Sequence, residues 1–280
     1  MNIINVKTKL DKEGIKAITG KFIDESYIKY PLICRDTTVY NERGELVLVF
    51  LKNAVPFTFA EKAYPFLRKS SGLTGNRSLA SGDLSSYKVG DKVGSLNGSI
   101  SDVRIGKIDG NRYYPIKKDG TLSNSPKSKE VESGIIGYMD RYSRIPYCRA
   151  TEMTRRYFED YKETLPYIRY ISAMFEKYVP EKYEIQKEYW GKINKDFKID
   201  NTAFTTVTVN KNFRTACHFD KGDYKEGFGN LSVLESGEYT GAYTVIPKYG
   251  IAVDVRNCDI CFFDVHELHG NTELKTKGMA

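Results

Sequence analysis

Histidine is rare in this sequence, and its distribution is uneven. The chain of 280 residues holds three histidines, all in its last quarter: His218 in "TACHFDKGD", and His266 and His269 in "DVHELHGNT". Asp220 follows His218 by two residues, so in an extended segment both side chains point to the same side. Two imidazoles and one carboxylate on one face leave three positions open on a ferrous ion. The pattern predicts an iron site built from His218, Asp220 and a second histidine.

His269 is the second histidine that we expect to bind the metal. It lies 49 residues after Asp220, which lets the chain pass through several strands and return to the same place. A Gly-Asn pair follows it, where a strand would give way to a turn. His266, three residues earlier, would face the opposite side of a strand, so we expect it at the surface or supporting the ligands. The alternative for His218 is a packing role, because an H-x-D pair also occurs by chance.

The cysteines do not predict a second metal site. Cys258 and Cys261 form the one C-x-x-C of the chain, whereas zinc sites of this type use two such pairs. We expect this motif inside a strand, where residues three apart diverge, and both cysteines to be small core residues. The odd, scattered set of five cysteines is typical of a reducing compartment.

The elements that must position the ligands are strands in the region 201–280. Five β-branched or aromatic segments follow one another with Gly, Pro or Asn between them and no helical pattern. They are "TAFTTVTVN", "GNLSVLES", "GAYTVIP", "YGIAVDV" and "CDICFFDV". Short strands in succession favour a jelly roll or barrel over a parallel sheet.

Upstream of these strands, the sequence predicts helices and loops. Apolar residues spaced by three and four predict a helix from Thr164 to Tyr178, with a second, shorter helix reaching Trp190. "GELVLVFLKNAVP" indicates a buried strand ended by Pro56. The segment Ser70–Ser128 is rich in Gly and Ser and contains two Asp-Gly steps, which suit loops and hairpins.

These elements together predict an α+β fold. Its core is a double-stranded β-helix, that is, a cupin-like jelly roll, with helices packed outside and an N-terminal loop-rich elaboration. We expect one domain over 1–280, in which 1–130 is the elaboration, 131–200 is mainly helical support, and 201–280 is the jelly-roll core with the metal site.

The charge of the chain is compatible with a nucleic-acid partner. The net charge is +7, and basic residues alternate with tyrosines in "DRYSRIPYCRATEMTRRY" and "KIDGNRYYPIKKDG". Such segments can follow a phosphate backbone and stack on bases, although an ordinary solvated surface has the same composition. No apolar run reaches the length of a membrane span, and no signal peptide is present at the N-terminus, so we expect an intracellular protein without a membrane partner.

Several motifs in order resemble a known family from Asn76 to the end of the chain. They are "NRSLASG", "SGIIGYMDRYSRIPYCRATEMT", H-x-D with a Gly-rich turn, "Y-x-G-x-Y-x-V-x-P-x-Y", "AVDVR-x-x-D" and "D-x-H-E-L-H-G-N-T". The chain resembles the TET/JBP family of iron(II)- and 2-oxoglutarate-dependent dioxygenases, in particular its phage and bacterial members. The fold and the metal site expected from the residues agree with this resemblance.

The resemblance implies an oxidoreductase that hydroxylates the 5-methyl group of thymine or 5-methylcytosine in DNA, with Fe(II) as cofactor and 2-oxoglutarate and O2 as co-substrates. The iron ligands would be His218, Asp220 and His269. A methyl group in a duplex lies in the major groove, so the nucleotide must be flipped out or single-stranded. We expect a monomer in a bacterial or host cytoplasm, or in a nucleus. Side chains expected at the substrate are Asp223, Asn230 and Arg149, and those expected on the DNA backbone are Arg155 and Arg156.

One residue implied by the resemblance is missing from the sequence. The family has an arginine some fifteen residues after the second histidine, which pairs with the far carboxylate of 2-oxoglutarate. This arginine would lie beyond Ala280, so the sequence is expected to lack its last strand, and "LKTKGMA" would lead into that strand. Arg256 matches a different motif and is not expected to replace it.

Two further functions remain open at this point. One is a dioxygenase of the same fold that acts on a free nucleotide, a small molecule or a protein side chain. The other is a non-catalytic DNA-binding relative.

Overall fold

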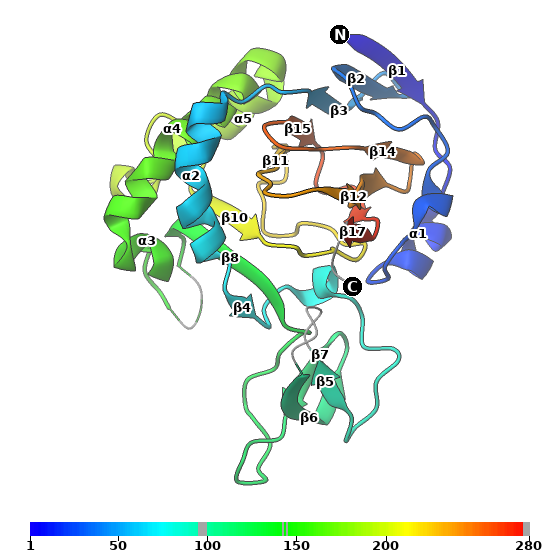
Figure 1. The fold of residues 1–280 in the computed structure, drawn as a ribbon, viewed down its shortest axis with the longest axis vertical. Coiled ribbons are helices and arrows are strands. Elements are labelled where there is room, and N and C mark those ends of the chain that lie inside the picture. Colours follow the sequence, from blue (N-terminus) through cyan, green and yellow to red (C-terminus); the bar gives the residue numbers. More distant parts are fainter. Residues whose placement is uncertain (95–99, 142, 144, 277–280) are drawn as a thin grey trace.

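The core of the protein is a sandwich of two β-sheets (Figure 1). The computed structural model describes residues 1–94, 100–141, 143 and 145–276. The larger sheet has the order β1-β2-β3-β15-β11 and is antiparallel except for the β1–β2 pair. The smaller sheet has the order β14-β13-β16. The strands are β1 (Asn2–Val6), β2 (Thr37–Asn41), β3 (Leu46–Leu51), β11 (Gly229–Ser232), β13 (Thr244–Ile246), β14 (Ile251–Val253), β15 (Ile260–Phe263) and β16 (Gly270–Asn271).

The central strands β3 and β15 are apolar on both faces, because both faces are covered. Side chains alternate along a strand, so every second residue points into the sandwich and the others point outward. Residues that pack inward against the smaller sheet are Leu48, Phe50, Cys261 and Phe263. Residues that pack outward against helices are Val49, Leu51, Ile260 and Phe262. This arrangement explains why "LVLVFL" and "ICFF" are continuous apolar runs.

Helices form a layer over the outer face of the larger sheet (Figure 1). Phe175 stacks on Phe262 of β15, with ring centroids 5.5 Å apart. The helices are α2 (Phe57–Ser70), α3 (Glu152–Arg156), α4 (Phe158–Tyr178) and α5 (Pro180–Gly191), while α1 (Lys12–Ile18) lies on the other side of the sandwich. The predicted jelly-roll core with helices outside is therefore confirmed.

Smaller sheets complete the body. One has the order β10-β8-β4, with β9 paired to β8, and another consists of β12 and β17. Their bounds are β4 (Leu73–Thr74), β8 (Val131–Met139), β9 (Arg149–Ala150), β10 (Thr206–Asn210), β12 (Tyr239–Gly241) and β17 (Leu274–Thr276). All five strand segments predicted for the region 201–280 contain a strand.

The remaining sheet in the described part of the chain projects away from the body (Figure 1). It has the order β5-β6-β7, with bounds β5 (Lys92–Gly94), β6 (Ile100–Asp109) and β7 (Arg112–Pro115). It has a small core of its own, to which Leu84, Val93, Ile105 and Tyr113 contribute. We call the region 84–130 the arm. Its hairpin turn at Gly110 follows Asp109, as the first Asp-Gly step predicts.

Some sequence predictions were wrong in detail. The α4 helix begins at Phe158, so Thr164 is not its start; the Thr164 hydroxyl is buried and donates to the Tyr161 carbonyl. β3 ends before Pro56, which instead precedes α2, a helix that was not predicted. The first 51 residues supply three strands of the larger sheet and are not an elaboration outside the core.

None of the helices in the described part of the chain has the length and apolarity needed to cross a membrane.

Gly134 in β8 lies where no side chain fits. A Cβ at this position would be 1.9 Å from the Ser70 carbonyl oxygen, a backbone atom that cannot rotate away. We expect Gly134→Ala to lower the free energy of unfolding by about 1–3 kcal/mol through overpacking, measured by urea denaturation. Gly191→Ala is the matched control, because a Cβ there meets nothing within 4 Å. Equal stability of the two variants would contradict the prediction.

Candidate metal centre

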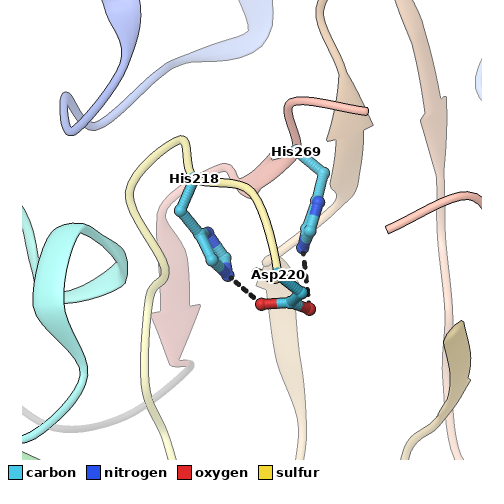
Figure 2. Close-up of side chains that lie close together, drawn as sticks. All are labelled: His218, Asp220 and His269. Carbon is cyan, nitrogen blue, oxygen red and sulfur yellow. Dashed lines mark ion pairs between the residues drawn. The ribbon is translucent and has the colours of Figure 1, made fainter. Parts of the chain in front are cut away.

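Three side chains that could ligate a metal point toward one another, His218 and Asp220 from one segment and His269 from another (Figure 2). The Nε2 atom of His218 lies 3.3 Å from one carboxylate oxygen of Asp220, and the Nε2 atom of His269 lies 3.6 Å from the other. Ligand atoms at about 2.0–2.2 Å from one divalent ion and at right angles to each other would be roughly 3 Å apart. The two contacts to Asp220 are close to this spacing, and all three ligand atoms lie within 4.8 Å of one another, so one ion could bind them together.

Backbone carbonyls hold both imidazoles in the orientation that a metal requires. The Nδ1 atom of His218 lies 2.8 Å from the Ala216 carbonyl oxygen, and that of His269 lies 3.0 Å from the Glu267 carbonyl oxygen. A carbonyl only accepts hydrogen bonds, so each Nδ1 carries the proton and each Nε2 presents its lone pair. His266 lacks this arrangement: its Nδ1 lies 3.1 Å from an Asp264 carboxylate oxygen.

The two chain segments that carry the ligands are joined to each other. The His218 amide donates to the His269 carbonyl and the His269 amide to the His218 carbonyl, which forms an isolated antiparallel bridge. The Asp220 amide donates to the Val265 carbonyl. These segments do not form the regular strand that we expected for the H-x-D pair. His266 lies in a turn, so the prediction that it faces the far side of a strand was wrong.

The three side chains are largely shielded from water. The His269 and His218 side chains are 9% and 14% exposed, and Asp220 is 39% exposed. The Phe263 ring contacts His269 edge-on, with centroids 5.2 Å apart. Desolvation raises the pKa of Asp220, but the contacts of its carboxylate with the two imidazoles outweigh this effect, so the net pKa is lowered. The carboxylate is therefore ionised and ready to bind a cation.

Asp223 is the predicted substrate residue that the structure brings nearest to this centre. Its pKa is raised, first by desolvation and then by the negative charge of Asp220, while the imidazoles of His266 and His269 act in the opposite direction. The Asp223 carboxylate is therefore within electrostatic reach of Asp220, and the residue itself is exposed.

The other predicted substrate and DNA residues lie elsewhere. Asn230 pairs in register with Phe262, on the face of the larger sheet that is covered by helices, opposite to Phe263. Arg149 in β9 pairs in register with Met139, at the end of β8. Arg155 and Arg156 are exposed in the last turn of α3. The arginine expected beyond Ala280 lies outside the described residues.

Two arginines near the centre were not singled out from the sequence. Arg77 donates through Nε to the Ser133 hydroxyl (2.7 Å) and through Nη2 to the Gly134 carbonyl (3.0 Å). The pKa of Arg77 is lowered, because desolvation outweighs the charge of Asp220, which acts in the opposite direction. The guanidinium therefore lies within electrostatic reach of Asp220. Arg214, four residues before His218, has a buried Nε atom without a partner. The "NRSLASG" motif was the signal that could have identified Arg77.

The cysteines do not belong to the cluster of potential ligands found among the described residues. Among the described residues, His218, Asp220 and His269 are the one cluster of three or more potential ligands. Cys258 lies in a turn with φ of 65° rather than inside a strand, and Cys261 lies in β15. Both are buried, as predicted.

Comparison with known proteins gives the chain its family. Thymine dioxygenase JBP1 of Trypanosoma brucei brucei is 36% identical over 148 residues, 52% of this chain and 17% of that protein. Bifunctional helicase and thymine dioxygenase JBP2 of Leishmania tarentolae is 36% identical over 146 residues, 51% of this chain and 13% of that protein. The chain thus spans less than a fifth of the length of these relatives.

A solved structure and a family description complete the comparison. The structure of NgTET1 in complex with 5mC DNA aligns with 95% of this chain and 87% of that chain, at 12% identity and a TM-score of 0.42. The family described as the oxygenase domain of the 2OGFeDO superfamily, whose cofactors are Fe(II) and 2-oxoglutarate, matches residues 134–279. The match covers more than half of the chain and includes all three ligands, so this protein belongs to the Tet/JBP family of oxygenases.

Proposed function

We propose that the protein hydroxylates the 5-methyl group of a pyrimidine in DNA, with iron held by His218, Asp220 and His269. The observation that carries this proposal is the convergence of two Nε2 atoms on one carboxylate, with each Nδ1 tied to a backbone carbonyl. When bound, iron(II) with 2-oxoglutarate and O2 supplies the oxidant: one oxygen atom enters the methyl C–H bond, and the other enters succinate, released with CO2.

The residues of this chain contribute orientation and a partly dry site. The Nδ1 contacts keep both rings in one tautomer, and the Phe263 ring restricts access of water from one side. Arg77 would hold a carboxylate of 2-oxoglutarate, because a guanidinium matches a carboxylate bidentately and this one is partly desolvated beside Asp220. Arg214, with its orphan Nε atom, offers a second guanidinium close to His218 in sequence.

DNA is the substrate that the comparisons favour. The two relatives at 36% identity are named thymine dioxygenases, which supports thymine ahead of 5-methylcytosine. The methyl group must leave the base stack to reach ligands that are mostly buried, so the nucleotide would be flipped out or single-stranded. Arg149, Arg155 and Arg156 remain proposed contacts to DNA, whereas Asn230 lies on the sheet face covered by helices and is no longer proposed to contact the substrate.

Asp223 is proposed to bind the edge of the flipped base. A carboxylate within electrostatic reach of Asp220 can accept a hydrogen bond from a pyrimidine, and a base-edge contact contributes about 1–3 kcal/mol of discrimination. We expect Asp223→Ala to lower kcat/KM on DNA by roughly 5- to 150-fold. The measurement is steady-state turnover with metal content determined in parallel. Loss of metal together with activity would mean that Asp223 supports the ligands and does not contact the base.

The proposed function is tested by product analysis. The protein is incubated with Fe(II), 2-oxoglutarate and DNA that contains thymine alone or thymine with 5-methylcytosine, and the digested nucleosides are analysed by mass spectrometry. A hydroxymethyl product in DNA supports the proposal, and the base that carries it identifies the substrate. Free thymidine and 5-methyldeoxycytidine are included, since oxidation of the monomers alone would indicate a nucleotide enzyme. Succinate release without any oxidised base would overturn the proposal.

A further inference from the structure

The arm (84–130) carries an excess of positive charge. Its sequence holds nine lysines and arginines against five aspartates and glutamates, so it provides +4 of the net charge of +7. A sheet with its own small core and this charge is a separate structural unit on the surface. Positive charge concentrated on a projecting element attracts polyanions.

One face of the arm gathers exposed basic side chains. Ile105 and Ile108 contribute to the arm's core, and the β-bulge between Ile105 and Lys107 lets residues three apart share a face, so Arg104 and Lys107 both point to the opposite face. Lys92 lies opposite Arg104 on the neighbouring strand, and the Lys107 ammonium lies 5.3 Å from the centroid of the Tyr114 ring. The Lys92, Arg104 and Lys107 side chains are all exposed. We call these four residues the outer face of the arm.

The base of the arm is fixed to the short helical segment Ser78–Ser81. The Asn111 side-chain amide, in the β6–β7 turn, donates to the Ser78 hydroxyl (2.7 Å). The Ser78 amide in turn donates to the Ser128 hydroxyl at the other end of the arm (3.1 Å). The segment 78–81 in turn contacts the chain that leads to the first ligand, because the Ala216 amide, two residues before His218, donates to the Ala80 carbonyl (2.8 Å). A polymer bound along the arm would therefore lead to the ligands.

We propose that the outer face of the arm binds the phosphate backbone of the DNA that flanks the base in the metal centre. Arg104 and Lys107 are three residues apart, which corresponds to roughly 10 Å along a strand. Side chains this far apart can contact different phosphates of one DNA strand. Tyr114 lies beside Lys107 on the neighbouring strand and offers a surface for a sugar or an unstacked base. This inference rests on the proposed function, because it takes DNA as the substrate.

The test compares two double variants that carry the same change of charge. In the arm variant, Arg104→Glu and Lys107→Glu are combined. In the matched control, Lys62→Glu and Lys177→Glu change two exposed lysines on α2 and α4. Binding of a fluorescein-labelled duplex is measured by fluorescence anisotropy over a range of salt concentrations. A third variant, Arg104→Gln with Lys107→Gln, removes the charge without reversing it.

We expect the arm variant to raise Kd at least tenfold and to lower the slope of log K against log salt by about 2, since each phosphate contact contributes about 0.9. The neutral variant should change Kd in the same direction by less, and the control should keep the wild-type slope. Metal binding and turnover of a short single-stranded oligonucleotide at saturation should be unchanged in all variants.

The outcomes separate the two proposals. If the wild type binds DNA with a steep salt dependence and the arm variant matches the control, the role of the arm is refuted while the proposed function stands. If the wild type binds neither duplex nor single-stranded DNA, the DNA substrate itself is refuted. Loss of metal from the arm variant would show that the arm supports the site structurally, and would also overturn the inference.

Discussion

Replacing any one of His218, Asp220 and His269 by alanine is expected to reduce iron-dependent turnover to the level of metal-free protein. Each side chain supplies one of three adjacent ligand atoms, so removing one leaves a two-ligand site that does not retain the ion. Turnover is measured as succinate released per protein with Fe(II) present. Metal binding is measured separately, with Mn(II) or Co(II) as probe, by the rise in Tm that a bound ion produces.

The same experiment distinguishes the two nearby histidines. At a metal concentration about 100 times Kd, binding stabilises the folded protein by about 2.7 kcal/mol, which the wild type should show and the three alanine variants should not. His266→Ala is the control, because its imidazole bonds to Asp264 and does not reach the Asp220 carboxylate. If His266→Ala were inactive and metal-free while His269→Ala kept both properties, the ligand assignment would be wrong.

Phe262→Ala is expected to lower the free energy of unfolding by about 3–5 kcal/mol. Phe262 is fully buried, and its stacking on Phe175 joins the helical layer to the larger sheet. Truncation would leave a cavity between two rigid elements that cannot both relax into it. The measurement is urea denaturation followed by circular dichroism.

The control for this variant is another phenylalanine of the helical layer. Phe57 begins α2 and is 62% exposed, so Phe57→Ala removes the same atoms at little cost in stability. A loss of less than about 1 kcal/mol for Phe262→Ala, comparable to a surface substitution, would show that the helices and the sheet are not coupled through this residue.

The parts of the fold with strong local patterns could be predicted from the sequence. The spacing of Ile168, Ile171 and Phe175 identified the α4 helix because its buried stripe repeats at the helical period. The ligands were identifiable because histidine is so rare in this chain and because H-x-D places two side chains on one side of an extended segment. His269 was preferred over His266 on the basis of its following turn, and the structure brings it to Asp220.

Features that depend on contacts distant in sequence could not be predicted. The α2 helix contains Pro65 and four aromatic residues, which weaken a helical pattern that packing against α4 restores. The tautomer of His269 is set by the Glu267 carbonyl, a backbone atom that no sequence pattern reveals. The position of the Arg77 guanidinium is set by its hydrogen bonds to Ser133 and Gly134 of β8, which lie more than fifty residues later in the chain.

The two-sided burial of β3 and β15 limits how this protein can evolve. In a strand with one solvated face, every second position tolerates substitution. In Leu48–Leu51 and Ile260–Phe263 every side chain belongs to one of two cores, so nearly every change has a cost. Substitutions that survive selection should therefore accumulate in the arm and the surface loops. New DNA sequence preferences would then arise where the chain is free to vary, while the segment leading to His269 stays almost unchanged.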